Sequence, residues 1–155
     1  MSQAPQESKD RETRRVVSLE ELVARATELR EHIDVLESTL NTYVNQYREI
    51  QLAFETLKNL PENTLQGYMV LDRLSSAMIP VSVLGEWPKS ILVNLGLGYY
   101  LKTNKDKALE ILSRRLQELE KVINTLQSQR KAVVEEYLGL QRVISQVLAS
   151  QRETK

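Results

Sequence analysis

Two long heptad repeats, one in each half of this 155-residue chain, limit its fold more than any other feature. In the N-terminal half, apolar residues recur every seven positions in two interleaved series. One series is Leu19, Ala26, Ile33, Leu40, Tyr47 and Phe54, and the other is Leu22, Leu29, Leu36, Tyr43, Ile50 and Leu57. This spacing predicts a long helix with a coiled-coil seam.

The C-terminal half repeats the pattern. One series is Leu109, Leu116, Ile123, Arg130, Tyr137 and Ile144, and the other is Leu112, Leu119, Leu126, Val133, Leu140 and Val147. Arg130 is the single seam position that is not apolar. We expect it to extend its charge into solvent or to pair with a carboxylate across the seam, which would fix the register.

Local signals set the expected limits of the helices. Ser18 and Glu21 form a capping box, and Pro61 ends the first helix near Leu60. Thr103 is the expected N-cap of the second helix. The chain then divides into a disordered polar tail (1–17), a helix (18–60), a connector (61–103), a helix (104–150) and a tail (151–155). A short connector folds the helices into an antiparallel pair, whereas one continuous helix pairing with another chain conflicts with the prolines between them.

The connector predicts β-strands, because it is rich in β-branched and aromatic residues and is interrupted by glycine and proline. The expected strands are 69–71, 79–84, 90–95 and 99–102, with 85–89 as a hairpin loop between the second and third and Gly96-Leu97-Gly98 as a tight turn between the third and fourth. The fold class is therefore α+β and mostly α: a coiled-coil hairpin whose helices are joined by two small β-hairpins.

Isolated two-stranded hairpins are marginal in water and leave bare edges. We therefore expect the chain to oligomerise through this region. The expected contact residues are Val70, Leu71, Ile79, Val81, Val83, Ile91, Leu92, Val93, Leu95, Gly96, Gly98 and Tyr99.

The composition argues against several function classes. Lys+Arg and Asp+Glu number 21 each, so the balanced charge offers no general attraction for nucleic acid. With no Cys and a single His, His32, which is expected on a helix surface, His/Cys metal clusters and Cys–His nucleophiles are excluded. We expect no enzyme activity and no cofactor. The polar N-terminus shows no signal peptide and no apolar run would span a bilayer, so a cytoplasmic protein is expected.

The segment Ile91–Lys102, followed by the helix entry at Lys107-Ala108, resembles the second β-hairpin of alpha-class prefoldin subunits. The block Gly96-Leu97-Gly98-Tyr99 is the most specific part, and the resemblance runs from Ser18 to the end of the second seam. It implies a hexamer of two alpha and four beta subunits whose hairpins form β-barrels. It also implies ATP-independent capture of unfolded polypeptides at the coiled-coil tips and delivery to a group II chaperonin. The loop 71–77 departs from the family because it lacks glycine.

Apolar residues beyond the seam support tip binding independently. Val134, Leu138, Val143 and Leu148 in the second helix, and Val16, Val17 and Val23 in the first, have no role in a solvated two-helix seam. The candidate client-binding residues are Val16, Val17, Leu19, Leu22, Val23, Val143, Ile144, Val147 and Leu148. The alternative is that the extra residues pack on one another or on a neighbouring subunit.

Two functions from different classes stay open at this point. One is a chaperone subunit, and the other is a static coiled-coil scaffold or adaptor that tethers folded partners through its β platform. The surplus of apolar residues near the helix ends favours the chaperone. Trp87 fits a subunit or chaperonin contact and equally well packing over the end of a barrel.

Overall fold

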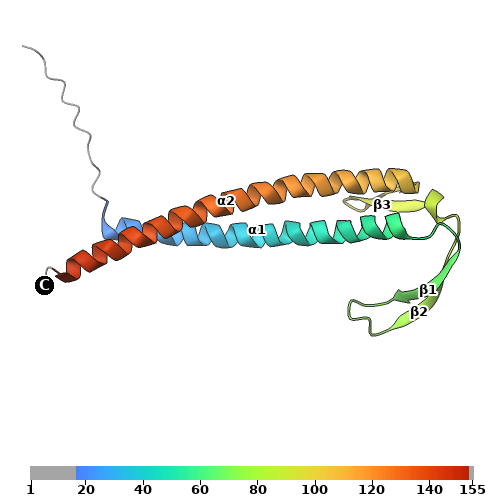
Figure 1. The fold of residues 1–155 in the computed structure, drawn as a ribbon, viewed down its shortest axis with the longest axis horizontal. Coiled ribbons are helices and arrows are strands. Elements are labelled where there is room, and N and C mark those ends of the chain that lie inside the picture. The colour runs from blue at the N-terminus through green and yellow to red at the C-terminus, as the bar shows by residue number, and fades with distance from the viewer. Residues whose placement is uncertain (1–16, 154–155) are drawn as a thin grey trace, which may run out of the picture. The chain divides into compact units, whose positions relative to one another are not determined.

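The computed structural model describes residues 17–153. It contains two long helices and four strands (Figure 1). Their bounds are α1 (Leu19–Asn59), β1 (Leu65–Val70), β2 (Met78–Val83), β3 (Ile91–Gly96), β4 (Tyr99–Thr103) and α2 (Lys105–Glu153), with a short 3₁₀ helix η1 (Trp87–Lys89) between β2 and β3. This is the mostly helical α+β fold predicted from the sequence. The described residues form two compact units, 17–35 with 131–153 and 36–130, and each is described separately below.

The capping box starts α1 as predicted. The Ser18 amide donates to Glu21 Oε2 at 2.8 Å, and the Glu21 amide donates to Ser18 Oγ at 3.2 Å. Two amide groups without helical partners are thereby satisfied. At the other end the helix stops at Asn59, and Pro61 follows directly after Leu60, whose amide still bonds to the Thr56 carbonyl at 2.9 Å.

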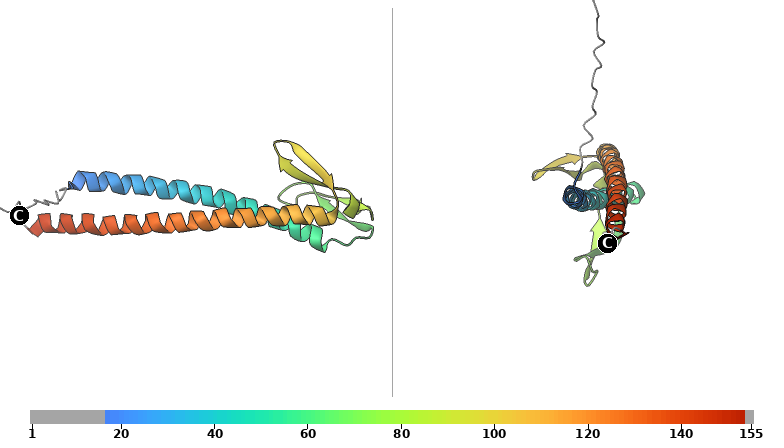
Figure 2. Two further views of the ribbon diagram at one scale, coloured as in Figure 1. Left: turned by 90° about the horizontal axis from the view of Figure 1, so that it is seen from above. Right: turned by 90° about the vertical axis from the view of Figure 1, so that its left-hand side faces the viewer.

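The heptad positions form the seam between α1 and α2 in both units, where the two helices run antiparallel (Figures 1 and 2). Every seam position is buried or half-buried except Arg130. The most buried are Ala26, Leu29 and Ile144 in one unit and Leu36 and Leu112 in the other. Arg130 pairs with Glu37, since its Nε and Nη2 donate to the same Oε1 at 2.8 and 2.6 Å. The predicted ion pair across the seam is therefore present.

The N-cap of α2 is Asn104, so the prediction of Thr103 is wrong. Asn104 Oδ1 accepts from the Lys107 amide at 2.9 Å. Thr103 instead ends β4, where it lies opposite Ile91. Asparagine is as good an N-cap as threonine or better, and ladder pairing extends the strand by one residue. At its other end α2 continues to Glu153, three residues past the predicted limit of 150.

The first hairpin, β1–β2, is longer than predicted on its first strand. β1 begins at Leu65, because it pairs along the whole of β2 from Leu65↔Val83 to Val70↔Met78. The sequence did not predict the first part of this strand, because neither Gln66 nor Gly67 has a high β propensity. Leu71, predicted to lie in the strand, belongs to the loop.

The segment 85–89 is not a hairpin loop, because β2 and β3 belong to different sheets. Leu84 instead begins a turn that leads into η1, with Pro88 near its start, where a missing amide hydrogen costs little. Trp87 anchors this connector, since its Nε1 donates to the Pro61 carbonyl at 2.9 Å. Lys105 Nζ lies 5.4 Å from the centre of the Trp87 ring and 2.8 Å from Glu62. Trp87 therefore ties the connector to the segment after α1.

The second hairpin, β3–β4, has the predicted tight turn. Leu97 and Gly98 occupy its two central positions with φ of 52° and 82°, as in a type I′ turn. Gly96 also has a positive φ of 97°, and its amide donates to Asn94 Oδ1 at 2.7 Å beside a register shift. Glycine suits these positions because it lacks a Cβ.

Candidate functional site

Exposed apolar side chains lie near the start of α1 and near the end of α2. Val17, Val23, Val143 and Leu148 are 50, 48, 44 and 43% exposed. We call these four residues the tip surface. Val16, also a candidate, lies outside the described residues. Apolar side chains at this exposure, gathered within one unit, offer a surface that an extended apolar polypeptide could cover.

The other candidate tip residues are seam residues in this structure. Leu19, Leu22 and Val147 are half-buried, and Ile144 is only 8% exposed. They hold the helices together and contribute less free surface. Of the extra apolar residues of α2, Leu138 is 48% exposed and Val134 is half-buried.

Polar groups border the apolar surface in this unit. Arg25 joins the two helices through Glu136, with Nη2 2.9 Å from Oε1, and this hydrogen bond raises the pKa of Arg25. Gln141 donates to Tyr137 Oη at 3.1 Å. A shallow groove of about 260 Å³ lies beside them, lined by residues that include Val23, Ala26 and Ile144. Both charges of the Arg25–Glu136 ion pair are half exposed, so solvent screens the pair and it contributes little to stability.

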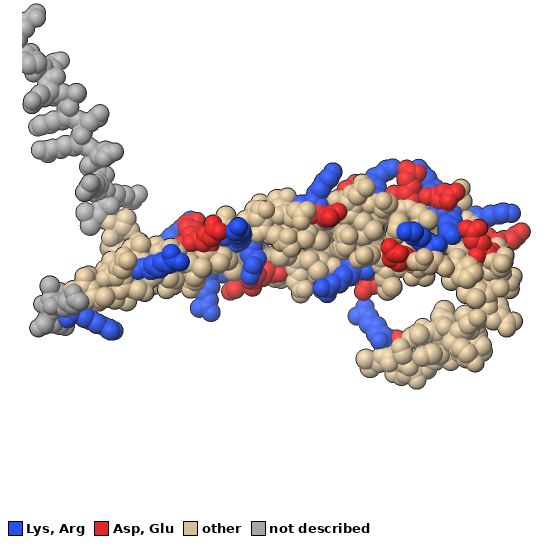
Figure 3. Space-filling model, in the orientation of Figure 1, with Lys and Arg blue, Asp and Glu red and all other residues tan. Residues whose placement is uncertain are grey.

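The β1–β2 hairpin exposes nearly all of its side chains. Only Leu65, Val81 and Val83 are half-buried. The exposed large apolar residues of this hairpin and its loop are Tyr68, Met69, Val70, Leu71, Leu74, Met78 and Ile79, from 41% for Ile79 to 88% for Leu74. No residue of either strand is charged, and the hairpin surface is mostly tan in Figure 3, whereas both signs of charge are mixed over the helices. A hairpin whose strands are apolar and uncharged is suited to burial against a partner.

The loop of this hairpin is ordered by one carboxylate. Asp72 accepts the amides of Leu74 at 2.7 Å, Ser76 at 3.1 Å and Ala77 at 3.3 Å. These hydrogen bonds, that from Ser76 foremost, lower the pKa of Asp72. Ser75 adopts a positive φ of 57° within the loop. The Asp72 hydrogen bonds thus stabilise the turn, although the loop contains no glycine.

The β3–β4 hairpin buries one face. Val93 is 5% exposed, whereas its neighbour Leu92 is 66% exposed, as expected for alternating sides of a strand. Tyr99, Tyr100 and Leu97 are also exposed, Leu97 to 98%. Val93 lines the same groove as Leu57 of α1 and Leu112 of α2, whereas the outer face of the hairpin and its turn are exposed.

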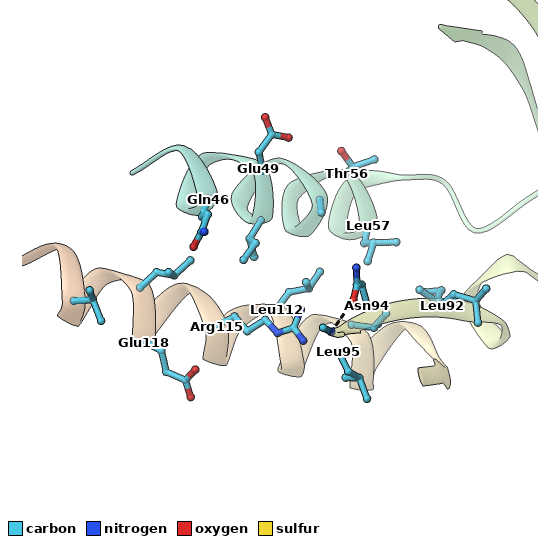
Figure 4. Close-up of a pocket in the computed structure, with 17 residues that line it drawn as sticks. Gln46, Glu49, Thr56, Leu57, Leu92, Asn94, Leu95, Leu112, Arg115 and Glu118 are labelled. Atoms are coloured by element: carbon cyan, nitrogen blue, oxygen red, sulfur yellow. Dashed lines mark hydrogen bonds between the residues drawn. The ribbon is translucent and has the colours of Figure 1, made fainter. Parts of the chain in front are cut away.

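An open groove of about 1110 Å³ lies between β3 and the neighbouring parts of both helices (Figure 4). Leu57 of α1 and Leu112 of α2 point into it, whereas Glu49 and Glu118 point away. Asn94 contributes a polar side chain whose Oδ1 is already bonded to the Gly96 amide. The groove is thus mainly apolar, with charges at its rim.

The described residues hold no arrangement typical of catalysis or metal binding. No group of three or more His, Cys, Asp or Glu residues within 17–153 could hold a metal ion. His32 is exposed on α1. No helix within this range is long and apolar enough to cross a membrane. The candidate sites are therefore surfaces, not a pocket with reactive groups.

The sequence interpretation missed three features of these surfaces. It did not predict the Asp72 loop, although an Asp at the start of a loop rich in Ser is a known turn signal. It placed Trp87 in a hairpin loop without its bond to Pro61, which depends on long-range packing. It also missed the open groove, since a groove depends on how the hairpin packs on the helices.

Comparisons with known proteins identify the family of this chain. The family Prefoldin, described as prefoldin subunit, matches residues 29–150. The prefoldin subunit alpha of Metallosphaera sedula is 30% identical over 141 residues, which is 90% of this chain and 96% of the relative. That of Sulfurisphaera tokodaii is 29% identical over 131 residues, covering 84% and 85%. A chain of filamentous PFD from Methanocaldococcus jannaschii, solved by cryo-EM, is 20% identical with a TM-score of 0.43 and coverages of 82% and 95%. The family match covers most of the sequence, and the chain therefore belongs to the prefoldin family of chaperones.

Proposed function

We propose that the chain is an alpha-class prefoldin subunit that holds unfolded polypeptides at its tip surface, without ATP, and delivers them to a group II chaperonin. The observation that carries the proposal is the group of apolar side chains Val17, Val23, Val143 and Leu148, each more than two-fifths exposed. Unfolded chains expose apolar segments, and burial of apolar area is the general driving force for such contacts.

The proposal includes an assembly with beta-class subunits, two alpha to four beta, in the cytoplasm. The hairpins supply the contacts, as β-barrels formed between subunits. The exposed, uncharged strands of β1–β2 and the exposed outer face of β3–β4 support this role, because bare edges and apolar faces are unfavourable in water. Two relatives that are 29 and 30% identical are both named prefoldin subunit alpha, which supports the alpha class.

The test replaces the four tip-surface residues with serine and leaves the seam intact. The intact chain, assembled with a beta-class subunit, should suppress light scattering when a chemically unfolded protein is diluted into it without nucleotide. The serine variant should lose most of this suppression while its helix content and melting temperature stay close to those of the parent.

A matched control shows whether position or mere apolar area matters. Leu52 and Val122 are also exposed, at 64 and 38%, but lie in the other unit. Replacing both with serine should leave the suppression intact. If the tip variant still suppressed aggregation fully, or if the correctly assembled parent never did, holding at the tips would be wrong and a scaffold that tethers folded partners would be the better account.

A further inference from the structure

The groove of about 260 Å³ beside the tip surface has an apolar end and a basic end. It is lined by Val23, Ala26, Thr27 and Arg30 from α1 and by Tyr137, Gln141 and Ile144 from α2. In both sets the residues follow one another at helical spacing, so each set forms one stripe along its helix. Because the helices run antiparallel, Val23 lies at the same end as Ile144, and Arg30 at the same end as Tyr137 (Figure 2).

The basic end of the groove offers hydrogen-bond donors. Among the described residues that line the groove, only Arg30 is charged. Arg25 is bonded to Glu136, whereas Arg30 forms no ion pair with another residue of 17–153. Tyr137 Oη accepts from Gln141 Nε2 at 3.1 Å, so the hydroxyl hydrogen of Tyr137 can be donated to a ligand. This end is therefore suited to an acceptor that carries negative charge.

The apolar end of the groove continues the tip surface, because Val23 belongs to both. Ala26 and Ile144 are buried beside it, so an apolar client side chain placed over Ala26 would contact apolar groups on both helices. Ala26 and Arg30 are four residues apart, which is about 6 Å along α1. Alternate residues of an extended polypeptide lie on the same side and are about 7 Å apart. One extended segment can thus reach both ends with residues two positions apart.

We propose that this groove selects client segments in which Asp or Glu lies two positions from a large apolar residue. The apolar side chain lies over Ala26, and the carboxylate accepts hydrogen bonds from Arg30 and Tyr137. A carboxylate is an anionic group common in unfolded polypeptides, and a guanidinium can bind it through two hydrogen bonds. The net charge of the chain is zero, so the molecule as a whole has no general attraction for acids. The inference rests on the proposed function and adds the chemistry of the preferred client.

The test measures the binding of short labelled peptides to the chain assembled with a beta-class subunit, by fluorescence anisotropy without nucleotide. Three peptides share one apolar sequence and differ only at the position two residues from a leucine, which is Glu, Gln or Lys. The Glu peptide should bind roughly three- to fivefold more tightly than the Gln peptide, because an exposed arginine–carboxylate pair has a modest effect. The Lys peptide should bind most weakly. The preference should shrink at high salt, which screens exposed charges.

Substitutions of Arg30 test whether this residue is the source of the preference. Arg30→Gln should remove it, Arg30→Lys should keep part of it, and Arg30→Glu should favour the Lys peptide instead. Arg142 is an exposed arginine of the same unit that does not line the groove, so Arg142→Gln is the matched control and should keep the preference. An equal loss in Arg142→Gln would mean that the charge of the helix ends as a whole attracts acids, and it would overturn the inference.

A second measurement reports on this chain alone, because anisotropy does not separate the subunits of an assembly. The chain has no cysteine, so Thr27→Cys places a single thiol in the groove. In an assembly with a cysteine-free beta-class subunit, a peptide with a cysteine beside its leucine should form a disulfide with this thiol. The Glu peptide should react faster than the Gln peptide, and Arg30→Gln should abolish the difference. Equal rates without Arg30→Gln would overturn the inference and leave holding at the tips intact, whereas no binding of any peptide would contradict both.

Discussion

The two hairpins come from one connector and have similar lengths, yet they are stabilised differently. β3–β4 turns on Leu97-Gly98 and buries Val93 beside the helices, so its own chain supplies part of its core. β1–β2 turns on a loop held by Asp72 and buries almost nothing. β3–β4 thus has one residue buried within its own chain, whereas every residue of β1–β2 is exposed or half-buried, and we expect β1–β2 to depend more strongly on a partner for its stability.

The largest effect should come from a charge on each side of β3. Val93→Asp puts an unpaired carboxylate at a site that is 5% exposed and should lower the free energy of unfolding by at least about 3 kcal/mol. Leu92→Asp, on the exposed side of the same strand, should change it by about 0.5 kcal/mol or less. Urea unfolding of the monomeric chain, followed by circular dichroism, measures both. Equal losses would mean that β3–β4 has no buried face.

The glycines of the two hairpins should respond in opposite ways. Gly98 has a φ of 82°, so Gly98→Ala should cost about 1–2 kcal/mol. Gly67 in β1 has an ordinary φ, and an added Cβ there would meet nothing within 4 Å. Gly67→Ala should therefore be neutral or stabilising by up to about 1 kcal/mol. The same unfolding assay would contradict this reading if Gly67→Ala were the more damaging change.

The connector between the hairpins offers a smaller effect. Trp87→Phe keeps most of the ring but removes the hydrogen bond to the Pro61 carbonyl, and it should cost about 0.5–1.5 kcal/mol. Exchange of backbone amides in η1 should become faster, whereas the β3–β4 turn should not respond. A variant indistinguishable from the parent in thermal unfolding and exchange would show that Trp87 does not anchor the connector.

The smallest effect is a difference between the two hairpin loops in their response to acid pH. Hydrogen bonds lower the pKa of Asp72 in the folded loop, so its contribution to stability is present above the unfolded value of about 3.9 and is lost as pH falls through the folded value. In an NMR titration the amides of Leu74, Ser76 and Ala77 should shift together in this acid range. The Gly96 amide, bonded to the uncharged Asn94, should not shift with them. Asp72→Asn should remove the response, and its persistence would point to another group.

Local signals predicted most of the fold, and long-range packing accounts for the rest. The capping box at Ser18, the seam residues and the Gly96–Gly98 turn each depend on nearby sequence, and the structure has all three. The predicted start of β1 was wrong because Gln66 and Gly67 adopt strand structure only through their pairing with β2. The prediction of a hairpin loop at 85–89 was wrong because the hydrogen bond from Trp87 to the Pro61 carbonyl joins residues far apart in sequence. The candidate tip residues included both Val143, which is 44% exposed, and the seam residue Ile144, which is buried, because heptad position alone was not used to divide them.

The most direct test of the difference between the hairpins is residue-resolved amide hydrogen exchange, on the monomeric chain and on the chain assembled with a beta-class subunit. In the monomer, amides of residues 65–83 should exchange fast and those of 91–103 slowly, because only β3–β4 packs on its own helices. On assembly, the protection of 65–83 should rise steeply, and that of 91–103 should change much less. Equal protection of the two hairpins in the monomer, or no gain in 65–83 on assembly, would contradict the account.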